Sequence, residues 1–176
     1  VADGRVLKSE LADGKRAGEN RTFYSWRADS ELLSNGMEAL LVNTLEPVLA
    51  ISRGLGEAYP ANIIADIWKL VFYNAAHDSI GGCNSDDTNQ DIFFRYKQAR
   101  DLALNLLELH TRKISIRIPR EHDYTFTVFN PLPHPTAQFV SDGAWLPGIP
   151  VTLRDADGNA LPYVIDEQED LTDYVL

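Results

Sequence analysis

One short stretch of the sequence combines residue types that could do chemistry. His77 and Asp78 come directly after a strongly apolar run and are closely followed by Gly81 and Gly82. A neutral imidazole is a good zinc ligand, and glycines let the backbone approach a ligand closely. Paired glycines also commonly end a helix. The stretch is therefore either a plain helix end or the wall of a site.

A single histidine does not make a metal site, because zinc needs three or four ligands. The other histidines are His110, His122 and His134, and none of them has metal-ligand spacing with His77. From the residues alone, a hydrogen-bonded histidine between domains is the favoured interpretation of His77, and zinc ligation is the minor one.

The residues around this stretch resemble glycoside hydrolase family 38, the α-mannosidases. The central match is the run His77-Asp78-Ser79-Ile80-Gly81-Gly82, with Trp68-Lys69-Leu70 before it and Ser85-Asp86 after it. The first helix of the family's middle domain is matched by Arg27-Ala28-Asp29, Asn35, Glu38 and Glu46-Pro47. The start of its C-terminal β region is matched by Phe129-Asn130-Pro131-Leu132. The resemblance covers roughly residues 9 to 133.

The resemblance implies a role for each residue of the pair. His77 would be a ligand of one Zn²⁺ ion, whose other ligands come from an N-terminal catalytic domain. Asp78 would hydrogen-bond substrate hydroxyls, and its alternative role is a carboxylate that ends the helix or hydrogen-bonds a metal ligand. The family's reaction is retaining hydrolysis, with a carboxylate nucleophile and a carboxylic acid that acts first as acid and then as base. Neither catalytic residue is identified in this segment, so the segment alone is expected to be inactive.

Composition and charge exclude some classes of partner. The chain has 176 residues and a formal charge of −10, from 26 acidic and 16 basic residues, which argues against binding to nucleic acid or anionic membranes. No stretch approaches the roughly 18 apolar residues of a membrane span, and no signal peptide is recognised. Cys83 is the only cysteine, so no internal disulfide can form. With the bacterial look of the Gly81-Gly82-Cys83 version of the motif, these features predict a cytoplasmic bacterial protein.

The spacing of apolar residues predicts three helices with short connections. The first runs from about residue 29 to 52, and Pro47 should kink it or start a new segment, because proline lacks an amide donor. The second runs from Pro60 to about Ala76, and its broad apolar surface predicts a central position. The third runs from Asp86 to Lys113 along a seam of Ile92, Tyr96, Ala99, Ala103, Leu106 and His110.

The character of the sequence changes at Ile114, where alternating apolar residues and prolines indicate β structure. Asp155 to Asn159 resembles half of a calcium loop but lacks the closing acidic residue, and it is interpreted as a hairpin turn. The predicted fold class is α+β. Residues 1–24 are expected to be a linker leaving a missing N-terminal catalytic domain, residues 25–113 an antiparallel three-helix bundle, and residues 114–176 the beginning of a β-sandwich.

The leading functional hypothesis is part of a zinc-dependent α-mannosidase, with a mannosylglycerate hydrolase as a close variant. Its expected partners are an α-mannoside substrate and the protein's own N-terminal catalytic domain, and homo-oligomerisation is left open. The first alternative is a non-catalytic helical and β module that binds a carbohydrate or a protein. The second is a helical interaction protein in which the His77-Asp78 pair is a docking feature.

Overall fold

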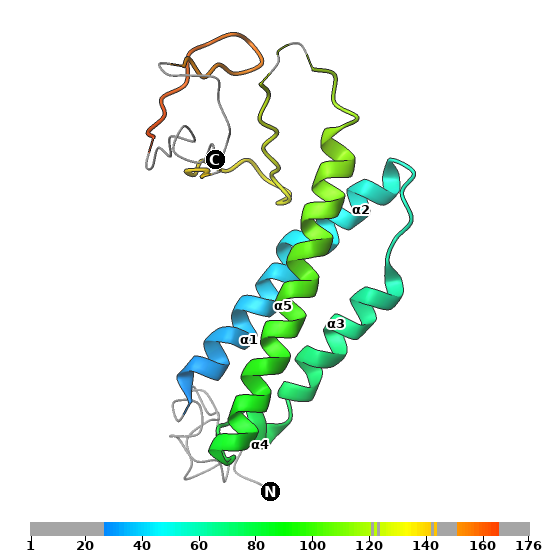
Figure 1. Cartoon of the computed structure of the whole chain (residues 1–176), viewed down its shortest axis with the longest axis vertical. Helices are drawn as coiled ribbons and strands as arrows, with labels where there is room; N and C mark the ends of the chain where they lie inside the picture. Colours follow the sequence, from blue (N-terminus) through cyan, green and yellow to red (C-terminus); the bar gives the residue numbers. More distant parts are fainter. Residues whose placement is uncertain (1–26, 121, 123, 142, 144–150, 166–176) are drawn as a thin grey trace, which may run out of the picture. The chain divides into compact units, whose positions relative to one another are not determined.

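The computed structural model describes residues 27–120, 122, 124–141, 143 and 151–165 (Figure 1). The chain divides into two units, residues 1–138 and 139–176. The described part of the first unit is mainly helical, and the linker predicted at residues 1–24 lies outside the described residues. No helix in the described ranges is long and apolar enough to cross a membrane.

The first predicted helix is present, but it contains a wide turn just before Pro47. Helix α1 (Ala28–Leu40) continues into the π-helical turn η2 (Leu41–Leu45) and then into α2 (Glu46–Gly54). In an unbroken α-helix the proline ring would clash with the carbonyl of Asn43, four residues earlier, and would leave it without a donor. A π-helical turn changes the hydrogen-bonding register at this point and removes that conflict.

Helix α5 (Asp86–Ser115) is the longest element, and it contacts α1, α2 and α3 (Ala61–Asn74) (Figure 1). The seam predicted for it is buried along its whole length. It joins one core cluster of Met37, Leu41, Leu45, Leu49, Ile64, Ile67, Val71, Ile92, Tyr96, Ala99, Ala103 and Leu106. A helical segment is thus confirmed, and its finer description as an antiparallel three-helix bundle stays a prediction.

The start of α5 follows from its first residues. The Ser85 hydroxyl accepts a hydrogen bond from the backbone amide of Thr88 at 3.2 Å and so caps the helix. Asp86 and Asp87 add negative charge to the first turn, where the helix dipole favours it. Helix α5 therefore begins with a capped, negatively charged first turn.

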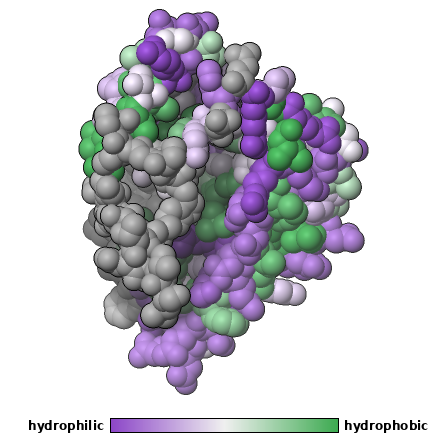
Figure 2. Space-filling model, turned by 45° about the horizontal axis from the view of Figure 1, so that its top comes forward, coloured by the Kyte–Doolittle hydropathy of each residue, from purple (hydrophilic) through white to green (hydrophobic). Residues whose placement is uncertain are grey.

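Helix α3 buries a narrower surface than its sequence predicts. Ile64, Ile67, Val71 and Asn74 form one buried stripe. Phe72 and Tyr73, however, are 64% and 66% exposed. Figure 2 shows hydrophobic residues interspersed with hydrophilic ones on the visible face. In the described part of the chain, α3 packs mainly against α5, and its buried residues are confined to this one stripe.

A buried polar pair joins α2 to α5. The Ser52 hydroxyl lies 2.8 Å from His110 Nδ1, and both side chains are buried in the core. Burial lowers the pKa of His110 from its ordinary value of 6.5, the positive charge of Lys113 lowers it further, and the negative charge of Glu57 opposes them. His110 is therefore a neutral hydrogen-bonding partner at neutral pH.

This lowered pKa makes the free energy of unfolding depend on pH. As pH falls below about 6.5, the unfolded chain takes up this proton before the folded one does, so stability is full above that pH and declines below it. The slope reaches at most about 1.4 kcal/mol per pH unit. In urea unfolding of the 176-residue chain, the wild type should have a lower free energy of unfolding at pH 5.5 than at pH 7.5. His110→Gln should lose the part of this difference that comes from His110.

The exposed His122 provides the matched control. His122→Gln should keep the wild-type difference between the two pH values, because the exposed His122 side chain is not part of the buried Ser52–His110 pair. An unaltered pH dependence in His110→Gln would show that the buried pair does not couple folding to protonation.

The turn predicted after residue 154 is confirmed, whereas the beginning of a β-sandwich is not. Asp155 accepts hydrogen bonds from the backbone amides of Asp157 and Asn159, at 3.0 and 2.8 Å. An isolated antiparallel bridge between Arg154 and Ala160 closes the turn. It is the one β pairing among the described residues, and no strand is formed in those that follow α5.

Candidate functional site: an anchored His-Asp tip

His77 and Asp78 begin a helix of their own instead of ending α3. They open the one-turn helix α4 (His77–Ile80), and Ala75 and Ala76 separate it from α3. Their side chains are 85% and 68% exposed, and His77 Nε2 lies 3.2 Å from Asp78 Oδ1. The structure therefore presents an imidazole and a carboxylate together at an open surface. We call these two residues the His-Asp tip.

The donors at the tip suit a zinc ion but are too few to hold one. A neutral imidazole and a carboxylate are both common zinc ligands. No group of three or more His, Cys, Asp or Glu side chains in the described ranges could hold a metal ion. His110 is buried against Ser52 and cannot contribute to the tip. A zinc ion at His77 would need its remaining ligands from outside the described residues.

Asn84 holds the backbone of the His-Asp tip, and it is not among the site residues predicted from the sequence. Its side-chain nitrogen donates hydrogen bonds to the carbonyl oxygens of Asp78, at 3.1 Å, and Ser79, at 3.2 Å. Asparagine often bonds nearby backbone groups in this way, so an Asn six residues after the Asp was the available signal. That signal is weak, because the same residue type is common in any loop.

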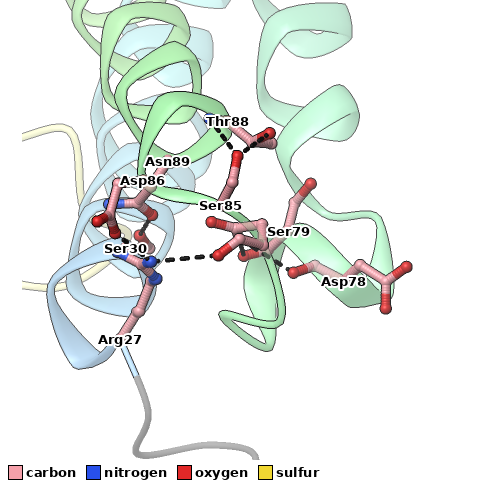
Figure 3. Close-up of polar contacts among 9 residues, drawn as sticks. Arg27, Ser30, Asp78, Ser79, Ser85, Asp86, Thr88 and Asn89 are labelled. Carbon is pink, nitrogen blue, oxygen red and sulfur yellow. Dashed lines mark hydrogen bonds and ion pairs between the residues drawn. The ribbon is translucent and has the colours of Figure 1, made fainter.

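Arg27 holds Asn84 in turn. Its Nη2 donates to the backbone carbonyl of Asn84 at 3.2 Å and pairs with Asp86 Oδ1 at 2.9 Å. Figure 3 shows Arg27 and Asp86 facing each other across the start of α5, with the Asp78 carboxylate pointing away from them. The beginning of α1, the loop and the beginning of α5 therefore meet in one polar cluster. The chain around the tip is tied to helices on both sides.

Asn74 fixes the last turn of α3, three residues before His77. It is fully buried, its Nδ2 donates to the Ile92 carbonyl at 3.0 Å, and its Oδ1 accepts from Arg95 Nε at 2.6 Å. Both partners belong to α5. The chain therefore enters the tip from a fixed position.

The glycines after the tip allow the chain to turn sharply. Gly81 and Gly82 are buried, and Gly82 has φ +74°, a conformation that disfavours any residue with a Cβ atom. The Gly82 amide donates to the Ser79 carbonyl at 3.2 Å, which closes the one-turn helix. Cys83 follows as an exposed, free thiol. The pair therefore serves as a helix stop beside the tip.

Comparison with known proteins places this segment among glycosidase-related proteins. The family described as "Alpha mannosidase middle domain" matches residues 20–114, a range that includes α1 to α4 and nearly all of α5. A relative from Halalkalibacterium halodurans, provisionally named a mannosylglycerate hydrolase, is 28% identical over 92 residues. That match covers 49% of this chain and 9% of the relative. No solved structure matches the chain. Because the family match spans more than half of the residues, the chain belongs to the α-mannosidase middle-domain family of glycoside hydrolase family 38.

Proposed function

We propose that the chain is part of a zinc-dependent retaining α-mannosidase in which His77 is a zinc ligand and Asp78 contacts substrate hydroxyls. The observation that carries this proposal is the exposed, anchored His-Asp tip within a segment of the α-mannosidase middle-domain family. Structural histidines in cores are desolvated, as His110 is, whereas His77 is open to a partner. Exposure and rigid attachment together favour a role in binding.

The two side chains would divide the work between metal and substrate. His77 would supply one nitrogen to the ion, and ligands from a catalytic domain outside the described residues would complete the set. The bound ion would supply electrostatic stabilisation of a manno-configured sugar through its 2- and 3-hydroxyls. An ionised carboxylate accepts hydrogen bonds through both of its oxygens. Oδ1 of Asp78 lies 3.2 Å from His77 Nε2, so Oδ2 would be the oxygen that accepts from such hydroxyls.

The substrate class that fits the family is an α-mannoside. The name of the relative adds mannosylglycerate as a specific form of this class, although the matched segment spans 9% of that protein. We propose the general activity, α-mannoside hydrolysis by the full-length protein in the cytoplasm, with the catalytic carboxylates in its N-terminal domain. We also propose that the chain folds as an antiparallel three-helix bundle followed by the start of a β-sandwich.

Removal of the metal tests this proposal directly. Treatment of the full-length protein with a strong chelator, followed by its removal, should reduce hydrolysis of 4-nitrophenyl α-mannoside by at least about tenfold, since the ion stabilises charge in the transition state. Stoichiometric Zn²⁺ should restore the rate, whereas Mg²⁺ should not, because magnesium prefers oxygen ligands.

A matched assay with 4-nitrophenyl α-glucoside controls for substrate class, because glucose lacks the axial 2-hydroxyl. Hydrolysis of the mannoside that is unchanged in the metal-free protein would contradict the zinc dependence. Binding of mannosides without any hydrolysis would favour the non-catalytic carbohydrate-binding module instead.

A further inference from the structure

We propose that Asn84 is a positioning residue for the His-Asp tip, and that Arg27 fixes Asn84 in this role. The inference rests on the proposed function, because it assigns to these two residues the task of presenting His77 and Asp78 to zinc and substrate. Neither residue contacts the His77 side chain or the Asp78 carboxylate in the described structure. Their effect passes through the backbone of the tip.

Helix α4 is too short to be stable by itself. A helix of four residues has a single turn of its own hydrogen bonds, and isolated turns of this kind are unstable in water. Its last carbonyl groups have no partners within the helix. The orientation of His77 therefore depends on groups that bond α4 from outside.

Asn84 provides this external support. One amide group bonds two consecutive carbonyls, those of Asp78 and Ser79, and so fixes the orientation of the peptide plane that follows Asp78. The Asp78 carbonyl receives its hydrogen bond from this amide, while the Ser79 carbonyl is shared with the Gly82 amide. Without the Asn84 amide, the middle of α4 would lose its attachment to the loop.

Asn84 is itself held by a residue that is distant in sequence. Arg27 lies 57 residues earlier, is largely buried, and donates to the Asn84 carbonyl with the same nitrogen that pairs with Asp86. Asn84 Oδ1 is buried without a hydrogen-bond partner among the described residues. An unpaired buried acceptor is unfavourable for folding, so local stability alone does not account for an asparagine at this position.

Two substitutions of Asn84 separate its donor role from its shape. Asn84→Asp keeps the size of the side chain but removes the amide donor, and Asn84→Ala removes both. In the full-length protein, each should weaken zinc binding by about 10- to 100-fold in competition with a chelator, the range typical of residues that support a metal ligand. Arg27→Ala should also weaken zinc binding. Asp86→Ala should leave zinc binding nearly unchanged, because the Asp86 side chain is 90% exposed and its ion pair with Arg27 contributes little.

Hydrogen exchange supplies a readout that does not depend on zinc or on activity. The amides of Ile80, Gly81 and Gly82 close α4 by bonding Ala76, His77 and Ser79. They should exchange faster in both Asn84 variants, while the amides of α3 and α5 keep their wild-type rates. Asn43→Ala is the matched control, because Asn43 is an exposed asparagine in η2 and its change should alter neither readout.

Each outcome decides the inference. Wild-type zinc affinity and wild-type exchange in Asn84→Asp would overturn it, and if both Asn84 variants lose their helical circular dichroism, Arg27→Ala makes the same test. Slow exchange throughout with weakened zinc binding would also overturn it, since the tip would then be ordered without Asn84. Failure of the proposed function looks different: zinc would stay bound in His77→Ala, whatever the Asn84 variants do.

Discussion

Replacement of His77 by alanine should remove zinc from the full-length protein and lower kcat/KM for an α-mannoside by more than about 100-fold. Loss of residues that only support a metal ligand typically costs 10- to 100-fold, and loss of the ligand itself should cost more. The side chain is exposed, so its removal leaves no core cavity and the helical fold should survive. Metal analysis, steady-state kinetics and circular dichroism of the same sample test all three expectations.

Asp78→Asn and His122→Ala complete this experiment. Asp78→Asn should retain zinc and lose activity, because it removes the charged acceptor for substrate hydroxyls without removing the imidazole. His122→Ala removes another exposed histidine and should match the wild type in zinc content and kcat/KM. Full zinc occupancy and unchanged turnover in His77→Ala would return the His-Asp tip to a structural role.

The helices were predictable where their signals are local. The seam of α5 repeats every three or four residues over most of the helix, and Ser85 marks its beginning, so both could be read from neighbouring residues. The turn at Asp155 has the same local character, because its side chain bonds amides two and four residues later. Such features need no knowledge of the rest of the chain.

The details near the site depend on distant residues and were not predictable in the same way. The sequence pattern continues the second helix to about residue 76, but α3 ends at Asn74, where the side chain is bonded to α5. The position of α4 depends on Asn84 and, through it, on Arg27, which is 57 residues away in sequence. Periodicity cannot report such contacts, because it describes only which face of an element is apolar.

The chemistry of the site was predictable from residue types, but the surroundings of the site were not. The His-Asp pair was identified from its position between an apolar run and two glycines, and the structure places it at an exposed tip. The exposure of Phe72 and Tyr73 was missed, since a broad apolar surface indicates what could be buried and not what covers it. In the described residues, only one stripe of α3 faces the core.

The second large effect concerns the core that supports the site. Ile67→Ala should lower the free energy of unfolding of the 176-residue chain by about 2–5 kcal/mol, the range for removing a fully buried aliphatic side chain. Ile67 is 0% exposed and lies on α3, which packs against α5 and leads into the tip. The substitution leaves a cavity at the contact between these helices. Urea unfolding followed by circular dichroism at 222 nm measures the loss, because the described fold is mainly helical.

Ile63→Ala is the matched control for this prediction. It makes the same chemical change one helical turn earlier on α3, at a side chain that is 41% exposed, and should cost less than about 1 kcal/mol. A large difference between the two variants would show that the stripe facing α5, rather than the apolar character of α3 in general, holds the helix that leads into the His-Asp tip. Equal losses would mean that Ile63, which lies beside the buried stripe, is as buried in solution as Ile67 is. The pair of variants therefore measures the stability of the support and reports how far the buried surface of α3 extends beyond that stripe.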